Sequence, residues 1–122
     1  MTLEEQLCGH LAACRYEDLP AEAVKAAKAS ILDTMGVMLA STTNSDDCVR
    51  LVELARDLGG KPESTVVGFG DRLPSPMAAF LNGALCHPLD YDDTHEGAKS
   101  HPTAQTLPAA LAVAQRVGKV NG

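Results

Sequence analysis

The stretch LPAEAVKAAKASILDTMGVMLAS, residues 19–41, decides the fold because its helical pattern is the clearest in the chain. Pro20 stands where a first helical residue is favoured. The second half of the stretch is apolar almost all round, so we expect neighbouring elements to bury this half. A buried Asp33 carboxylate would need a partner, and a hydrogen bond to a neighbouring helix end is expected. Apolar side chains that recur on one face at helical spacing are Val24, Ala27, Ile31, Met35 and Met38.

Two further helices are predicted beside this stretch. Before it, Thr2 and Glu5 have the spacing of a capping box, and apolar residues follow at helical intervals as far as Cys14. After it, the polar residues 41–47 form a linker that can cap a third helix, which the glycines at 59 and 60 stop. The first half of the chain is therefore expected to contain three helices.

The second half of the chain adds one short extended segment and two helices. STVVGFG, residues 64–70, is typical of a strand. Ser75 as the N-cap and Pro76 as the first residue begin a helix that should end before Pro88, and residues 103–117 form the last helix. The predicted fold class is mainly α, a bundle of about five helices with at most one short extended segment.

Composition supports this fold and narrows the classes of function. Hydrophobic residues make up 45% of the 122 residues and aromatic residues 3%, which favours one domain of close-packed helices. The net charge is -6 and no two basic residues are adjacent, which argues against nucleic acid as a partner. The chain lacks a basic leader and an apolar run of roughly 18 residues. We expect a cytoplasmic protein outside the membrane whose four cysteines are reduced and buried.

A second stretch, HPLDYDDTHEGAKSHP at residues 87–102, gathers most of the side chains that carry chemistry. It is predicted to be a loop that leaves a buried helix, and Asn82 in that helix is predicted to be a structural amide satisfied by loop backbone. The loop has neither an HExxH motif nor a cysteine partner, so we expect no metal ion. The side chains that could in principle bind one are His87, Asp90, Asp92, Asp93, His95 and His101.

Two other interpretations of the loop stay open from residue types alone. A carboxylate beside an imidazole can be tuned so that one accepts and the other donates a proton near neutral pH, which suits an elimination reaction. Alternatively, Asp92, Asp93 and Glu96 are solvated. Asp93 or Thr94 would then cap a turn, and His87 would be a satisfied helix-end residue.

Two long segments closely resemble the N-terminal part of the MmgE/PrpD family, which includes 2-methylcitrate dehydratase and cis-aconitate decarboxylase. They are LDTMGVMLAS and GGKPESTVVGFGDRLPSPMAAFLNGALCHPLDYDDTHEGAKSHPTAQTLPAALAVAQ, residues 32–41 and 59–115. The centre of the resemblance is a segment NG-x-x-x-H-x-LD-[YF]-DDTH followed by HP and PAALA, which is specific as an ensemble. The resemblance implies a mostly helical domain, completed elsewhere by further helices and an α/β lid, in homodimeric enzymes without metal or organic cofactor.

The same resemblance assigns roles to residues of the loop. It implies elimination of water or carbon dioxide from a small di- or tricarboxylic acid. Asp90 and His101 match the acid/base positions, and Thr94 matches a hydroxyl that donates a hydrogen bond to the substrate. Asp93 and His95 beside them are further candidates for substrate binding.

Two departures from the family pattern shape the expectation for this chain. Pro88 stands where a small helix-compatible residue is common, and the sequence stops at Gly122 where family members continue. An anionic substrate needs cationic partners, and the loop offers only Lys99 and protonated histidine. We expect residues 1–122 to be one incomplete helical domain of such a lyase, inactive or weakly active alone. The alternative is a non-catalytic helical module that self-associates through exposed apolar faces.

Overall fold

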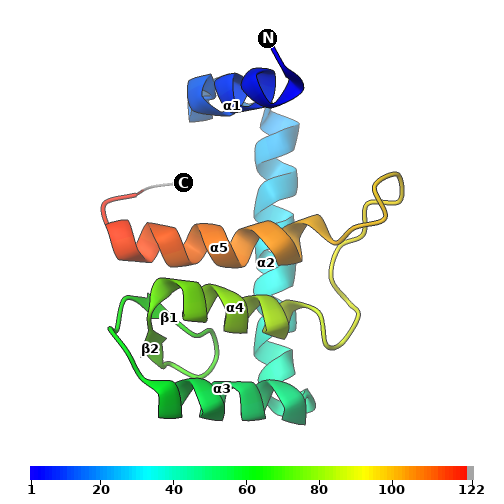
Figure 1. Ribbon diagram of the computed structural model, residues 1–122. Helices are drawn as coiled ribbons and strands as arrows, with labels where there is room; N and C mark the ends of the chain where they lie inside the picture. Colours follow the sequence, from blue (N-terminus) through cyan, green and yellow to red (C-terminus); the bar gives the residue numbers. More distant parts are fainter. Residues whose placement is uncertain (121–122) are drawn as a thin grey trace.

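The computed structural model of the chain describes residues 1–120 and is mainly helical (Figure 1). The predicted fold class is confirmed, since five α-helices carry the structure and the only sheet in the described residues has two short strands. In chain order the elements are α1 (Leu3–Ala13), a 3-10 turn (Tyr16–Asp18), α2 (Ala21–Asn44), α3 (Asp46–Leu58), β1 (Ser64–Thr65), β2 (Arg72–Leu73), α4 (Ser75–Cys86) and α5 (Pro102–Val117).

Helix α4 lies at the centre of the bundle. It packs against α2, α3 and α5 and against both strands, whereas α1 lies apart at the far end of α2 (Figure 1). Burying one large aliphatic side chain stabilises a fold by about 1.5–3 kcal/mol. The core is built from aliphatic residues, as the composition predicted, and its largest fully buried members include Met38, Val52, Val66, Leu81 and Leu85.

The predicted cap of α1 is confirmed. The Thr2 hydroxyl accepts a hydrogen bond from the Glu5 backbone N–H at 3.3 Å, and the Glu5 carboxylate accepts one from the Thr2 N–H at 2.8 Å. Helix α3 begins with the Ser45 hydroxyl accepting from the Cys48 N–H, and ends at Gly59, whose φ of 64° is left-handed and suits glycine. Both ends of α3 therefore follow from the sequence.

The polar residues after Ser41 are not the predicted linker, because α2 continues to Asn44 and only Ser45 separates it from α3. Polar side chains of this last turn bond back to helix carbonyl groups. The Thr42 hydroxyl donates to the Leu39 carbonyl at 2.7 Å, and the Asn44 amide donates to the Ala40 carbonyl at 2.8 Å. These bonds occupy the polar groups within the helix itself.

The predicted burial of the second half of α2 is wrong for much of its surface. Thr34, Val37, Met38 and Ser41 are the buried residues of α2, whereas Leu32 is 76% exposed and Asp33 is also exposed. The bundle covers one side of the helix only (Figure 1). Asp33 consequently needs no buried partner.

Ser75 is not the N-cap of α4, contrary to the prediction. It is the first residue of the helix, and its hydroxyl donates to the Glu63 carboxylate at 3.2 Å and lies 3.0 Å from the Ser64 hydroxyl. The Glu63 carboxylate also accepts from the Ser75 backbone N–H at 3.2 Å. A carboxylate distant in sequence therefore caps this helix, which local sequence patterns do not reveal.

A short hairpin packs against both α4 and α5. Strands β1 and β2 pair antiparallel, with Ser64 opposite Leu73, and the second strand was not expected from the sequence. Asn82 on α4 fixes the chain after β1, since its side chain accepts from the Val67 N–H at 2.9 Å and donates to the Thr65 carbonyl at 3.0 Å. The prediction of a buried structural amide is thus confirmed.

The cysteines divide between the core and α1. Cys48 and Cys86 are buried as predicted, but Cys8 and Cys14 are exposed, because no residue of α1 is buried. All four thiols are free. The helices of the described chain are too short or too polar to cross a lipid bilayer.

Candidate functional site

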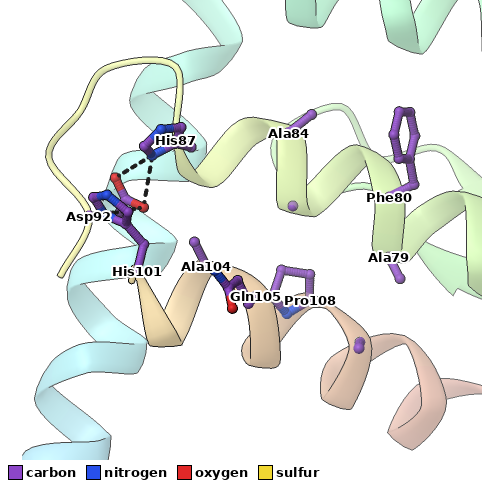
Figure 2. A pocket seen from close by; sticks show the side chains of 11 residues that line it. Ala79, Phe80, Ala84, His87, Asp92, His101, Ala104, Gln105 and Pro108 are labelled. Carbon is purple, nitrogen blue, oxygen red and sulfur yellow. Dashed lines mark hydrogen bonds and ion pairs between the residues drawn. The ribbon is translucent and has the colours of Figure 1, made fainter. Parts of the chain in front are cut away.

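A cavity of about 470 Å³ lies between α4 and α5. Its walls are mostly small residues, among them Gly83 and Ala84 of α4 and Ala104 of α5, and a polar cluster lies at one end (Figure 2). Pro108 in α5 has no N–H to donate to the Ala104 carbonyl, so helix α5 carries an acceptor without its usual helical partner beside this cavity.

The polar cluster consists of His87, Asp92 and His101. His87 follows the last residue of α4, His101 precedes the first residue of α5, and Asp92 lies in the loop that joins them. The Asp92 side chain is completely buried, against exposed fractions of 57% for the His87 side chain and 30% for His101. The two helix ends thus bring both imidazoles to one inward-pointing carboxylate.

The contacts of the two imidazoles with Asp92 differ. Nδ1 of His87 is hydrogen bonded to both carboxylate oxygens, at 3.0 and 3.1 Å. Nδ1 of His101 lies 3.2 Å from Oδ2, but the direction of its ring N–H does not meet that oxygen, so this buried nitrogen has no hydrogen bond in the described structure. We regard the His101 contact as electrostatic. The two rings also meet edge to face, with centroids 4.6 Å apart.

The charges of this loop act on Cys86, the last residue of α4. Burial, followed by the negative charges of Asp92 and Asp93, raises the pKa of the Cys86 thiol to about 12. Its sulfur donates to the Asn82 carbonyl at 3.1 Å. Because the thiolate is the reactive form, Cys86 is a structural thiol and not a nucleophile.

Asp90 and His101, the predicted acid/base pair, occupy different positions. His101 lines the cavity, whereas Asp90 is exposed, has a left-handed φ of 55° and is not among the lining residues in the described part of the chain. The carboxylate beside His101 is that of Asp92. The catalytic roles of Asp90 and His101 stay predictions.

The three residues predicted to bind substrate lie outside the cavity walls formed by residues 1–120. Asp93 anchors the start of α5, since its carboxylate accepts from the Thr103 N–H at 3.1 Å and from the Thr103 hydroxyl at 2.6 Å. Thr94 and His95 are exposed, and Nδ1 of His95 accepts from the Ala98 N–H at 3.0 Å. Asp93 therefore caps the start of α5, not the loop turn that the sequence left open. Substrate binding by all three residues stays a prediction.

Half of the candidate metal ligands gather in one place. Ligand atoms of His87, Asp92 and His101 all lie within 4.8 Å of one another, and two imidazoles with a carboxylate form a donor set that zinc accepts. The separations of 3.0 to 3.2 Å between Nδ1 and carboxylate oxygens are also those of direct contacts, so no ion is needed to explain the arrangement. The prediction that the site uses no metal stays a prediction.

Sequence reasoning missed the central position of Asp92. The interpretation of Asp92 as a solvated side chain is wrong, because the residue is 6% exposed. Three aspartates occur within four positions of the loop, and loops lack the regular periodicity that would show which one points inward. The available signal was that histidines begin and end the loop, so that an inward carboxylate would meet both.

Comparison with known proteins adds a relationship over nearly the whole chain. A profile of the MmgE/PrpD N-terminal domain matches residues 5–121. Cis-aconitate decarboxylase of Mus musculus is 28% identical over 120 residues, which are 98% of this chain and 24% of that protein. The Homo sapiens cis-aconitate decarboxylase is 36% identical over 93 residues, 75% of this chain and 19% of that protein.

A third relative has a related name. The cis-aconitate decarboxylase-like protein oryM of Aspergillus oryzae is 27% identical over 112 residues, 90% of this chain and 23% of that protein. The chain thus spans about a fifth to a quarter of the length of these curated relatives. With the domain profile matched over residues 5–121, the chain belongs to the MmgE/PrpD family and carries its N-terminal domain.

Proposed function

We propose that this chain supplies the acid/base part of the active site of a lyase that eliminates water or carbon dioxide from a small di- or tricarboxylic acid. The observation that carries the proposal is the position of His87 and His101 at one end of the cavity, with the buried Asp92 carboxylate against them. Imidazole is the side chain whose protonation changes most readily near neutral pH. The cytoplasmic location expected from the sequence is part of the same proposal.

His101 is the proposed proton carrier at the cavity. In a dehydration, a base takes the proton from the carbon next to a substrate carboxylate, and that electron pair becomes the double bond. The C–O bond breaks, and the hydroxyl leaves as water after taking a proton from the acid. In a decarboxylation, the C–C bond to the leaving carboxylate breaks, and the acid protonates the carbon that keeps the electron pair. Asp90 is proposed as the partner of His101 on the strength of the family resemblance.

The shape and charge of the cavity support an acid with a short apolar body. Away from its polar end, the cavity is lined by small apolar residues together with Phe80 and Gln105. Imidazoles are its only cation-forming groups within the described chain. Two or three substrate carboxylates need more positive charge than two imidazoles supply. The chain spans only 19–24% of the length of its relatives, so we expect weak binding and little or no turnover by these residues alone.

Binding and turnover of cis-aconitate and 2-methylcitrate by the 122-residue chain test this proposal. On addition of the acid, we expect the amide NMR shifts of the residues that line the cavity to change. In His101→Ala these shifts should no longer respond to the acid. His10→Ala is the matched control, because it removes an imidazole from the exposed helix α1 and should leave the response intact. Shift changes outside the cavity, or an unchanged response in His101→Ala, would refute the proposed site.

Asp90→Asn tests the proposed partner separately. Because Asp90 lies outside the cavity walls, we expect this variant to bind the acid as the unchanged chain does. Any turnover detected by proton NMR should be lost in Asp90→Asn. Turnover that survives in Asp90→Asn but disappears in His101→Ala would remove Asp90 from the mechanism and keep the site.

A second function, self-association, is favoured by the apolar surface of the N-terminal region. A groove of about 570 Å³ is lined by Tyr16 of the 3-10 turn, by Leu19 directly after it, and by α2 residues that include Val24 and Ile31. The first turn of α1 is acidic, while Lys28 lies at the groove, so two copies have complementary charges. Exposed apolar surface of this kind marks interaction sites, and the proposed partner is a second copy of the chain.

Sedimentation velocity over a concentration series tests this second function. We expect a dimer for the unchanged chain and a monomer for Ile31→Asp, which places a charge in the groove. Val117→Asp is the control, since Val117 is 67% exposed at the end of α5, away from the groove. A monomer at every concentration would reject self-association without affecting the proposed acid/base site.

A further inference from the structure

The buried Asp92 carboxylate is shared by two histidines, and the sharing limits which ring nitrogens can exchange protons with a ligand. Nδ1 is the ring nitrogen that contacts the carboxylate in both His87 and His101, at 3.0 and 3.2 Å. Nδ1 of His101 is itself buried, so the exposed part of that side chain lies on other atoms. The nitrogen of His101 that remains for a ligand is Nε2.

We infer that Asp92 is a positioning residue that fixes both imidazoles as Nδ1–H tautomers and leaves Nε2 of His101 as the basic nitrogen at the cavity. Its meaning for catalysis rests on the proposed function. Asp92 itself touches the two imidazoles and is not proposed to exchange a proton with the substrate.

The chemistry of a carboxylate dictates the tautomer. An ionised carboxylate only accepts hydrogen bonds, so Nδ1 of His87, which is hydrogen bonded to it, carries the proton. The same charge 3.2 Å from Nδ1 of His101 favours a proton on that nitrogen too. In a neutral imidazole the other nitrogen then has a free lone pair. The opposite tautomer would set the Nδ1 lone pair against a buried negative charge.

Asp92 has room for both rings. A carboxylate offers about four acceptor sites on its two oxygens. His87 approaches both oxygens, and His101 lies on the Oδ2 side with its N–H misdirected. A buried N–H without a partner is unfavourable, and Oδ2 of Asp92 at 3.2 Å is the acceptor that would satisfy it.

The neighbouring titratable groups do not compete for this role. Both oxygens of Asp93 are occupied by Thr103, and the Cys86 thiol donates to a backbone carbonyl of α4. Asp90 is exposed and forms no side-chain hydrogen bond or ion pair with residues 1–120. Asp92 is therefore the carboxylate that can set the tautomer of His101.

Long-range proton–nitrogen NMR of the 15N-labelled chain tests the inference, at a pH where the imidazoles are neutral. We expect the Nδ1–H pattern for His87 and His101. His95 should show the opposite, Nε2–H, because its Nδ1 accepts from the Ala98 N–H. This internal contrast needs no substitution, so it holds even where a variant fails to fold.

Two substitutions sharpen the assignment. Asp92→Asn should remove the preference, so that His87 and His101 shift toward the tautomer mixture of the exposed His10. Asp90→Asn removes the same charge two positions away and should leave all four histidines unchanged. A shift of equal size in both variants would overturn the inference, because it would indicate a general charge effect.

Other outcomes in the unchanged chain also decide the matter. An Nε2–H pattern for His101 would overturn the inference. A metal-bound pattern at His87 and His101 that disappears with EDTA would overturn it as well, and would identify Asp92 as a metal ligand. The measurement uses no ligand, so failure of the chain to bind an organic acid would reject the proposed function while leaving the positioning role intact.

Discussion

Residues 1–33 and residues 34–117 are both mostly helical, yet only the second region has a core. In residues 1–33 of the described structure no residue is buried, whereas every residue of the hydrophobic cluster lies between Met38 and Leu107. Each region contains a helix with a side-chain N-cap, Thr2 at α1 and Ser45 at α3. Helix formation in this chain therefore follows the local sequence, while burial depends on packing against helices and strands that are distant in the sequence.

The largest expected difference between the regions is in the cost of removing a leucine side chain. Leu85 on α4 is completely buried, and Leu85→Ala should lower the free energy of unfolding by about 2–5 kcal/mol. Leu7 on α1 is 56% exposed, and Leu7→Ala should change the free energy of unfolding by less than about 0.5 kcal/mol. Urea denaturation measures both, and equal losses would mean that α1 packs in solution.

The next effect concerns buried polar groups. Asn82→Ala leaves the Val67 N–H and the Thr65 carbonyl without their partner, and an unsatisfied buried group costs about 1–3 kcal/mol. Asn44→Ala removes an amide that bonds only within its own exposed helix end, and should have a much smaller effect. The same denaturation experiment compares the two, and similar losses would show that Asn82 is not a structural amide.

Two N-caps of the same kind separate local from global stability. Ser45→Ala at α3 should lower the free energy of unfolding by about 1 kcal/mol, because α3 belongs to the bundle. Thr2→Ala at α1 should reduce the helical circular dichroism signal without moving the denaturation midpoint. A shifted midpoint in Thr2→Ala would show that α1 unfolds together with the core.

The smallest effect is that of a surface ion pair between α3 and the hairpin. Arg56 donates to both oxygens of Asp71 at 2.9 and 2.7 Å, which holds the pKa of the Asp71 carboxyl below its ordinary value of 3.8. A carboxyl whose pKa is lowered on folding stabilises the fold above its unfolded pKa, and this contribution is lost as the pH falls through the folded pKa.

Asp71→Asn should therefore cost about 0.2–1 kcal/mol at neutral pH, a range reduced by exposure of the pair to solvent. The difference from the unchanged chain should vanish as the pH falls through the folded pKa of Asp71, which lies below the ordinary value of 3.8. Asp18→Asn, in the 3-10 turn of the N-terminal region, is the control and should show no comparable dependence. A difference for Asp71→Asn that persists in strong acid would point to packing instead of charge.

The sequence predicted the features that depend on neighbours along the chain. The capping box at Thr2 and Glu5 and the glycine end of α3 are local chemistry, and both are confirmed. The buried face of α2 could not be read in the same way, because its apolar residues continue around the helix and the bundle covers only one side. Ser75 shows the same limit, since its partner Glu63 reaches it through the hairpin.

The same contrast between local and long-range features applies to the candidate site. Its location in the loop of residues 87–102 was predicted, because carboxylates and imidazoles concentrate there. The meeting of His87, Asp92 and His101 depends on how α4 and α5 place the two ends of that loop, which residue types do not encode. The Asp90 assignment came from the resemblance alone, and its position outside the cavity walls gives it no geometric support.

Helix α2 joins the two regions as one continuous element of 24 residues, about 36 Å long at 1.5 Å per residue. Its first turns are exposed to solvent, and one face of its later turns packs against the bundle. Deuterium uptake should therefore fall along this one helix, from rapid local fraying to protection limited by global unfolding. A partner bound to the exposed end of α2 would slow deuterium uptake there and reduce the difference along the helix. Deuterium uptake by α2 can therefore detect a partner on the N-terminal region without any added label.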